Sequence, residues 1–521
     1  MPILRRLLAF ALLTAVLGTG PGLSAWPAAA QQPDIITIGT TDLPTSLDPA
    51  EAYDFMTWEV LSHLYVGLVR QVTGTLEYEL ALAESYTLSA DGLSYTFILR
   101  QGQSFSDGTP ITAQTFADSV TRVLALRRPA VALIEPYVAA VNAPSERELV
   151  FTLKRPTPYF LQLLALPAYY PQHPDLISAA APQPFAGAII GNGPYVLQRF
   201  AVRQEIVLRV NPAYALGPVP KTETIVLRHF NRSQDLREAL LRHEVDMAWR
   251  ALLLNDVERL HDQAGINVVD IPSTRAYYLY LNQNREPTDD PMVREAITLL
   301  VDRQAIASVL DGHATPLTSL VPPDFAVAYA PLWPGTPDIP TAEATLRAAG
   351  YKERGTPKLA ITIGFSLPLY GIPYADAVAR LARASFQPTN FVDYSVFTDV
   401  DGGTFVDVLE AGDTALAVFA WTPVVPHPYA YLFPLLHSSQ ALPANGRFAR
   451  PELDLLLDQI AQQQDSAQQA ILYAQLAQWV LDDHALIPLW QDHLQVVAWD
   501  TIEGVDIAPN FWLSYSQLVR R

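Results

Sequence analysis

The stretch TRAYYLYLNQNREPTDDPMVREAITLLVDRQAI (residues 274–306) decides the fold class of this chain. Its first half, residues 276–281, is a continuous aromatic and aliphatic run, which is typical of a strand buried on both faces of a sheet. Asn282 ends the run, and a polar loop follows it. Asp290 and Pro291 then predict the start of a helix, because Asp caps free amides and Pro fits the first helical position. Apolar residues recur after them at helical spacing, so we expect a buried strand followed by an amphipathic helix.

The same alternation of strands and helices continues along the rest of the chain. Strands are predicted at residues 35–40, 95–100, 149–153, 195–200, 205–210, 225–228, 245–249, 266–271, 359–365, 391–397, 416–421, 486–499 and 511–518. Helices are predicted at residues 58–70, 113–126, 233–242, 342–349, 374–384, 451–463 and 467–482. This order predicts α/β lobes with largely buried sheets, and 521 residues are too many for one core.

The N-terminus has the pattern of a secretory signal peptide. Arg5 and Arg6 precede an apolar run at residues 7–17, which is too short to span a bilayer comfortably. Three alanines at residues 28–30 supply a cleavage site before Gln31. We therefore predict that residues 1–30 are removed; the alternative is a retained membrane anchor. No later stretch is long and apolar enough for a transmembrane helix.

Composition excludes several classes of protein. The chain has no cysteine, which excludes disulfides, thiolate metal sites, thiol catalysis and a lipid-bearing cysteine after the signal peptide. The net charge of −19 makes nucleic acid and anionic lipid surfaces unsuitable partners. A hydrophobic content of 50% is ample for a large core, so the body of the chain is folded.

No catalytic or metal-binding motif is present. The chain lacks a G-x-S-x-G elbow, an H-E-x-x-H pair and a Walker loop, and a strand pattern follows the glycine-rich turn at residues 191–194. His427 and His437 lie ten residues apart among prolines, which favours packed or solvated imidazoles over a metal site. We expect no enzyme activity, cofactor or metal.

Four other blocks accompany residues 274–306. They are TSLDPAEAYDFMTWEVLSHLYVGLVR (residues 45–70), LAESYTLSADGLSYTFILRQGQSFSDGTPITAQTFADSVTRVL (82–124), GNGPYVLQRF (191–200) and NGRFARPELDLLLDQI (445–460). Together, and in this order, the five blocks resemble the peptide/nickel-type (family 5) extracellular solute-binding proteins of ABC importers. The resemblance covers most of the mature chain.

This resemblance implies a bilobal α/β fold, the Venus-flytrap fold of periplasmic binding proteins. We expect two lobes with mixed sheets, an inserted subdomain, and a hinge at which the chain crosses twice, near residues 271–274 and 488–491. Lobe I would comprise residues 31–50, 190–272 and 490–521, the subdomain residues 51–189, and lobe II residues 273–489. A ligand would bind in the cleft between the lobes.

The resemblance also implies a function and its partners. The protein would capture a solute in the periplasm and deliver it to the transmembrane permease of an ABC importer, as a monomer. The solute would be a peptide or another small molecule; peptides, oligosaccharides, metal chelates and opines all remain open. A secreted bilobal hydrolase and an envelope chaperone or scaffold are the alternatives.

The segment LAVFAWTPVVPHPYAYLF (residues 416–433) occupies the place of a family segment that reads W-x-A-D-Y-x-D-P. In peptide-binding relatives, the first acid of that motif pairs with the α-ammonium group of the ligand. Here Trp421 matches the motif, Thr422 falls at its variable position, Val424 replaces the first acid and His427 replaces the second. Because a buried ammonium group needs a carboxylate partner, this departure argues against recognition of a free peptide N-terminus.

The other candidate ligand-binding residues are Asp42, Tyr137, Tyr277 and Tyr278. Asp42 could supply a relocated carboxylate from the opposite wall, or be a solvated loop residue. Tyr137 lies where relatives often reach a ligand from the subdomain. Tyr277 and Tyr278 point in opposite directions on a strand, so at most one faces the cleft. Trp421 is either a cleft residue or a core residue, and residues 511–512 are expected in the core.

Overall fold

The structure is a computed structural model that describes residues 34–178, 181–182, 189–250, 252–305, 312–366, 374–399 and 407–521. The predicted signal peptide, residues 1–30, lies outside the described residues. Within the described residues, no helix combines the length and the apolar character that a bilayer-spanning segment requires.

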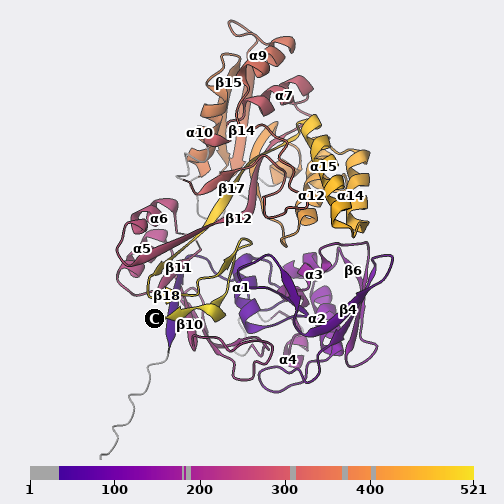
Figure 1. Ribbon diagram of the computed structural model, residues 1–521, viewed down its shortest axis with the longest axis vertical. Helices are drawn as coiled ribbons and strands as arrows, with labels where there is room; N and C mark the ends of the chain where they lie inside the picture. Colours follow the sequence, from indigo (N-terminus) through magenta and orange to yellow (C-terminus); the bar gives the residue numbers. More distant parts are fainter. Residues whose placement is uncertain are drawn as a thin grey trace, which may run out of the picture.

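One sheet, with eleven strands counted over the described residues, extends through both lobes (Figure 1). The strand order is β15-β14-β16-β12-β17-β11-β1-β10-β9-β8, and β13 pairs with β17. The bounds are Ile35–Thr40 (β1), Tyr195–Ala201 (β8), Glu205–Val210 (β9), Thr224–His229 (β10), Met247–Trp249 (β11), Ile266–Leu281 (β12), Ala314–Pro316 (β13), Leu359–Ser366 (β14), Val392–Asp399 (β15), Leu416–Trp421 (β16) and Leu486–Trp499 (β17). Because β1 pairs in parallel with β10 and β11 whereas β12 is antiparallel to β16 and β17, the sheet is mixed, as predicted.

The two longest strands, β12 and β17, pair with each other along almost their whole length and connect the lobes. We predicted two separate strands at residues 266–271 and 276–281, and this is wrong, because β12 continues between them. The register shifts between Pro272 and Ala276, so the polar residues in between form a bulge and do not break the strand.

Helices cover the sheet in both lobes. Figure 1 shows α7, α9, α10, α12, α14 and α15 in the upper lobe, and α1 to α6 in the lower part of the molecule. Their bounds are Phe55–Leu64 (α1), Ala113–Leu126 (α2), Phe160–Leu163 (α3), Pro174–Ile177 (α4), Ser233–Leu241 (α5), Leu254–His261 (α6), Pro291–Leu300 (α7), Ile339–Ala348 (α9), Tyr374–Phe386 (α10), Pro428–Leu436 (α12), Ala441–Gly446 (α13), Pro451–Gln462 (α14) and Ser466–Asp483 (α15). The Asp290 side chain accepts a hydrogen bond from the Met292 amide, and Pro291 begins α7, as predicted.

A second sheet with the order β4-β5-β7-β6 lies beside α2 in the lower part of the molecule (Figure 1). Its strands are Ala83–Leu88 (β4), Ser94–Leu99 (β5), Val138–Asn142 (β6) and Glu148–Leu153 (β7). Short elements complete the chain: Val69–Gln71 (β2), Tyr78–Leu80 (β3), Ile502–Glu503 (β18), Ile507–Ala508 (β19), Trp512–Leu513 (β20), Val519–Arg520 (β21), and the 3₁₀ turns Pro129–Leu133, Pro167–Tyr169 and Tyr515–Gln517. The residue boundaries that we predict for the lobes and the subdomain stay predictions.

Two further predicted elements need correction. The helix expected at residues 58–70 is α1, which starts at Phe55 and ends at Leu64. Residues 511–518, expected as a strand returning to the first lobe, form a two-residue strand and a 3₁₀ turn. In both places, contacts with distant parts of the chain override the local pattern.

The Leu-Asp-Pro turn is fixed by a buried ion pair. Arg122 on α2 donates two hydrogen bonds to the Asp48 carboxylate, at 2.8 and 2.7 Å, and both side chains are almost fully buried. Arg122 also donates to the Gln172 side chain at 2.8 Å. This bidentate geometry fixes the residues before α1 against α2.

The Gly-Asn-Gly-Pro turn is fixed against the end of α1. The Asn192 side chain accepts a hydrogen bond from the Val66 amide (3.0 Å) and donates one to the Val66 carbonyl (3.1 Å). A Cβ atom on Gly193 would lie 2.5 Å from the carbonyl carbon of Leu64, so only glycine fits there. The turn therefore positions the residues after α1.

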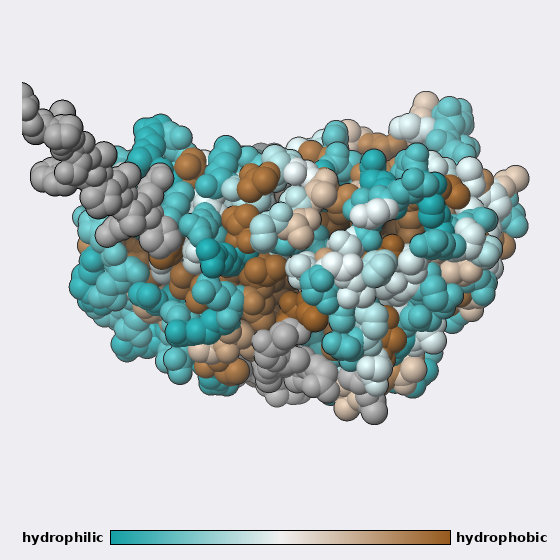
Figure 2. Space-filling model, turned by 90° about the horizontal axis from the view of Figure 1, so that it is seen from below, coloured by the Kyte–Doolittle hydropathy of each residue, from teal (hydrophilic) through white to brown (hydrophobic). Residues whose placement is uncertain are grey.

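Hydrophilic residues dominate the periphery of the lower face of the molecule, and apolar residues gather near its centre (Figure 2). The hydrophilic periphery agrees with the net charge of −19, which favours a well-solvated surface.

Candidate functional site

A cavity of about 280 Å³ lies where the two lobes meet. Its walls come from the C-terminal half of α1 and the residues after it, the β2–β3 hairpin, the segment 508–517, and residues 423–425. The last of these segments follows β16 and belongs to the upper lobe, whereas the others belong to the lower part of the molecule (Figure 1). A cavity with walls from both lobes meets the basic requirement for a ligand that bridges them.

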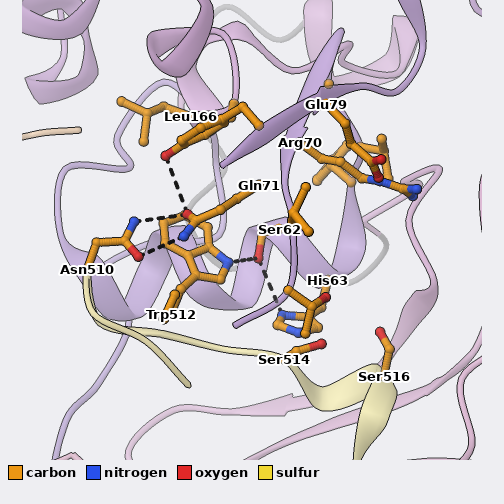
Figure 3. A pocket seen from close by; sticks show the side chains of 18 of the residues that line it. Ser62, His63, Arg70, Gln71, Glu79, Leu166, Asn510, Trp512, Ser514 and Ser516 are labelled. Carbon is orange, nitrogen blue, oxygen red and sulfur yellow. Dashed lines mark hydrogen bonds and ion pairs between the residues drawn. The ribbon is translucent and has the colours of Figure 1, made fainter. Parts of the chain in front are cut away.

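The floor of the cavity is formed by α1 and the C-terminal segment (Figure 3). The Trp512 indole donates a hydrogen bond to the Ser62 hydroxyl at 3.0 Å, and Ser62 donates to the Glu59 carbonyl at 2.7 Å. The His63 ring stacks on Tyr515 with ring centroids 3.9 Å apart. Burial lowers the pKa of His63, so this imidazole is neutral at pH 7.

A buried carboxylate fixes the C-terminal segment beneath the cavity. Glu59 accepts hydrogen bonds from the Tyr515 hydroxyl (2.6 Å), the Leu513 amide (3.2 Å), the Trp249 indole (3.0 Å) and the Arg250 guanidinium group (3.0 Å). Because its lone pairs are occupied and Arg250 balances its charge, Glu59 has a structural role and is not offered to a ligand.

Two amide side chains close one side of the cavity (Figure 3). Gln71 on β2 and Asn510 in the C-terminal segment each donate to the other at 2.9 Å. The Tyr78 hydroxyl lies 3.4 Å from the Gln71 side-chain oxygen. The hydroxyls of Ser514 and Ser516 also line the cavity, and these neutral groups suit hydrogen bonds to an uncharged ligand.

Among the described lining residues only Arg70 and Glu79 are charged, since His63 is neutral. Their opposite charges compensate each other. Arg70 and Glu79 pair at 2.7 Å at one end of the cavity. No group of three or more His, Asp or Glu side chains that could hold a metal ion occurs among the described residues. The cavity is therefore suited to a ligand part without net charge.

Of the predicted site residues, Val424 lines this cavity directly. Thr422 lies beside the hinge, where its hydroxyl accepts a hydrogen bond from Arg275 Nε at 3.3 Å. Trp421 is the last residue of β16 and pairs with Ala276 of β12. Its side chain is half-buried, and its indole N–H has no hydrogen-bond partner in the described part of the chain. Trp421 does not line the cavity, and its indole nitrogen is shielded from solvent, so its contact with a ligand stays a prediction.

Tyr137 and His427 come together in an aromatic cluster between the lower part of the molecule and the upper lobe. The Tyr159 hydroxyl donates to the Tyr137 hydroxyl at 3.2 Å, and the Tyr159 ring lies 5.8 Å from the His427 ring. His427 also caps α12, because its Nδ1 accepts from the Tyr429 amide at 3.1 Å. Burial lowers the pKa of His427 to about 4, so the ring is neutral at pH 7.

Asp42 lies outside the cavity and does not contribute to its lining. Its carboxylate is 3.9 Å from Arg250, and the Leu43 amide donates to it at 2.9 Å. Burial raises the pKa of Asp42, and the positive charge of Arg250 only partly offsets this effect. A carboxylate that already faces a cation is a poor relocated anchor for an ammonium group.

The predicted site residues Tyr277 and Tyr278 of β12 are both buried. Tyr277 stacks on Trp490 at 4.4 Å, and its hydroxyl lies 3.5 Å from the Asp492 carboxylate. Tyr278 points into the upper lobe, where its hydroxyl donates to the Leu320 carbonyl at 2.5 Å. Tyr277 therefore belongs to the hinge, next to the residues that contact Thr422, and Tyr278 lies among core residues.

The sequence did not predict several residues of the cavity, chiefly Ser62, Gln71, Asn510 and Trp512. Residues 511–512 were expected in the core; Phe511 is buried, but Trp512 lines the cavity. No local signal identifies these residues, because the hairpin and the C-terminal segment are far apart in the chain and meet only in the folded protein.

Comparisons with known proteins agree with this geometry. The family model for bacterial extracellular solute-binding proteins, family 5 Middle, matches residues 77–442. The probable D,D-dipeptide-binding periplasmic protein DdpA of Escherichia coli K12 is 28% identical over 92% of this chain and 93% of its own length. The glutathione-binding protein GsiB of Salmonella typhi is 30% identical over 65% of each chain.

Solved structures share the fold. NikA from Brucella suis, in complex with Fe(III)-EDTA, has a TM-score of 0.81 at 21% identity and covers 94% of this chain and 100% of its own. DppA from Helicobacter pylori, in complex with the peptide STSA, has a TM-score of 0.72 at 22% identity, with 93% and 98% coverage. The chain therefore belongs to the bacterial extracellular solute-binding proteins of family 5. It is a solute-binding protein of an ABC transporter, to which it delivers its ligand.

Proposed function

We propose that the protein captures a small solute that carries no free ammonium group at the upper-lobe wall of the cavity. The observation that carries this proposal is the combination of Val424 at that wall with a lining whose two charges, Arg70 and Glu79, neutralise each other. An ammonium group buried beside a valine would lack a counter-ion and would cost several kcal/mol.

The names of the relatives refer to different ligands, and the lining of the cavity favours some classes of ligand over others for this protein. DdpA is described as binding D,D-dipeptides and GsiB as binding glutathione. Neutral oligosaccharides, blocked or cyclic peptides and small apolar solutes fit the present lining better than unmodified peptides. Asp42 supports this choice, because it faces Arg250 and does not line the cavity.

Ligand contacts in this proposal come from both sides of the cavity. Trp421, Thr422 and Val424 would contact the solute from the upper lobe, with Tyr137 and His427 at the edge where the subdomain meets α12. Tyr277 would act from the hinge. Asp42 and Tyr278 have the weakest support as ligand contacts. Asp42 lies outside the cavity and faces Arg250, and Tyr278 lies among core residues.

The mechanism we propose is closure of the lobes around the solute. Lobe I (residues 31–50, 190–272 and 490–521) and the subdomain (51–189) would move against lobe II (273–489) about the two crossings. The solute would favour the closed state by binding it more tightly, and the permease would recognise that state.

The remaining features of this proposal concern chemistry and location. The mature chain would be a monomer without covalent chemistry, cofactor or metal. A cleavable signal peptide and the absence of a cysteine for lipidation would leave it free in the periplasm. The lack of catalytic motifs supports this assignment over a secreted hydrolase.

The test is to purify the protein without denaturation, extract it and identify the bound compound by mass spectrometry. We expect one stoichiometric neutral solute that is recovered unchanged. Adding it back to stripped protein should raise the melting temperature, since it binds the native state, and lower the radius of gyration in small-angle X-ray scattering. An authentic solute that changes neither quantity would refute lobe closure, and turnover of the solute would favour the hydrolase.

A further inference from the structure

Arg70 and Glu79 form one end wall of the cavity. They face each other on β2 and β3 as direct cross-strand neighbours. Arg70 Nε pairs with Glu79 at 2.7 Å, and Arg70 Nη1 donates to the Tyr214 hydroxyl at 3.0 Å and to the Leu216 carbonyl at 2.9 Å. One guanidinium group therefore connects the hairpin to the loop after β9, and Figure 3 shows the pair well apart from Trp512 and Asn510.

A second, more open depression lies on the other side of this pair. Its volume is about 720 Å³, and Arg70 and Glu79 line it as well as the cavity. The rest of its lining is strongly polar: Glu84, Arg100, Gln101, Gln103 and Arg147, with the apolar residues Leu80, Ala81, Ala215 and Leu216. Because the two spaces share only this pair, Arg70 and Glu79 separate them.

The Arg70–Glu79 ion pair closes this wall in the structure, but both side chains are partly exposed to solvent. The Arg70 side chain is 33% exposed and the Glu79 side chain 48% exposed. Water competes for such a pair, so it contributes little to stability and can separate without unfolding the hairpin.

The small volume of the cavity means that the Arg70–Glu79 wall can affect which solutes fit. At about 280 Å³ the cavity lies at the lower limit of ligand sites, which span roughly 300 to 1,000 Å³. We propose that the Arg70–Glu79 pair limits the size of the solute: closed, it restricts binding to small compounds, and open, it lets the polar end of a longer solute enter the depression. This inference deepens the proposed function and rests on it.

The absence of cysteine allows a direct test. Ser516 lines the cavity, and Figure 3 shows it on the same side of the view as Arg70 and Glu79. In the variant Ser516→Cys, the rates of reaction with small methyl methanethiosulfonate and with bulky fluorescein-5-maleimide would be compared. Adding Arg70→Ala should raise the rate for the bulky reagent at least about fivefold, because the wall is removed, and should change the rate for the small reagent by less than about twofold.

Two further variants make the result specific. Glu79→Gln removes the same ion pair from its other side and should act in the same direction, which keeps the test valid if Arg70→Ala fails to fold by circular dichroism. Arg209→Ala removes another ion pair, with Glu223, whose arginine is more exposed than Arg70 and which does not line the cavity, and should leave both rates unchanged. Equal acceleration of both reagents, or no acceleration in either wall variant, would overturn the proposal. Since no ligand is used, failure here leaves solute capture intact, and failure to find a solute leaves the labelling result intact.

Discussion

Gln71 and Asn510 exchange two hydrogen bonds of 2.9 Å although 439 positions separate them in the sequence. Gln71 lies on the β2–β3 hairpin near the start of the chain, and Asn510 lies in its last segment. The pair joins two walls of the cavity, so the shape of the cavity depends on a contact between the two ends of the folded chain.

We expect Asn510→Ala to open this side of the cavity. The variant leaves the Gln71 amide without its reciprocal partner, which typically costs about 1–2 kcal/mol of stability. Hydrogen exchange should become faster at residues 508–517 and 69–80, and stay unchanged in the upper lobe. Gln114→Ala, which removes an exposed hydrogen bond to Asp118 on α2, is the control and should have no such effect. Unchanged exchange in Asn510→Ala would contradict the role assigned to the pair.

Replacing Val424 with Asp should restore recognition of free peptide amines. In the natural protein, calorimetry with a pool of di- to pentapeptides and with its N-acetylated counterpart should show weak binding of the free pool and no loss of affinity on acetylation. In Val424→Asp the free pool should gain at least about tenfold in affinity over the acetylated pool, since a buried ammonium group gains a charged partner. Val424→Asn, of similar size but uncharged, should not discriminate. Tight binding of free peptides by the natural protein, abolished by acetylation, would refute the claim and direct attention to Asp42→Asn.

Trp421→Ala should weaken binding of the extracted solute by about 2 kcal/mol or more, as expected when an aromatic anchor is lost. The match of Trp421 to the family motif and the incomplete burial of its side chain support this expectation. The melting temperature should fall only modestly. If the variant unfolds while its residual folded fraction binds normally, Trp421 is a core residue, for which the loss is typically about 3–5 kcal/mol.

Arg122→Ala should destabilise the fold strongly. The Asp48 carboxylate would remain buried without its main cation, which costs about 3–5 kcal/mol in comparable buried pairs. Urea denaturation should show a large drop in the midpoint. Arg127→Ala, which removes an exposed pair with Glu135, should change stability by less than about 0.5 kcal/mol. Similar midpoints for the two variants would show that the buried pair does not hold the turn.

Protonation of His427 should destabilise the protein in acid. Burial lowers the pKa of His427 from its ordinary value of 6.5 to about 4, so the unfolded chain takes up this proton first. Its contribution to stability is therefore complete above pH 6.5 and is lost as the pH falls towards 4, by about 3 kcal/mol. His427→Gln should flatten the dependence of unfolding free energy on pH in this range. His261→Gln, at an exposed position, should not change it. Parallel curves for His427→Gln and the natural protein would contradict this assignment.

Local patterns predicted elements best where the side chains alone decide the structure. Residues 113–126, 416–421 and 486–499 form a helix and two strands with the predicted bounds. These elements were predicted correctly because periodicity and capping act within a few residues. The family motif led to Val424 as a candidate ligand-binding residue. Val424 lines the cavity, and its contact with a ligand stays a prediction.

The failures share a physical cause, which is contact between distant segments. The helix predicted to reach Arg70 ends at Leu64, where Asn192 binds both backbone groups of Val66. The C-terminal residues were expected to form a strand, but Glu59 fixes them through hydrogen bonds to the Leu513 amide and the Tyr515 hydroxyl. Neither partner can be recognised from the local sequence.

The continuous pairing of β12 with β17 limits how the lobes can move. Both chain crossings belong to one hydrogen-bonded ladder, and its register shift between Pro272 and Ala276 is where the ladder is least regular. Sliding or separation of the lobes would break many backbone hydrogen bonds, whereas twisting at the bulge would break few. The connection therefore has one soft degree of freedom, a torsion about the strand axis, and any opening of the cavity must follow that rotation.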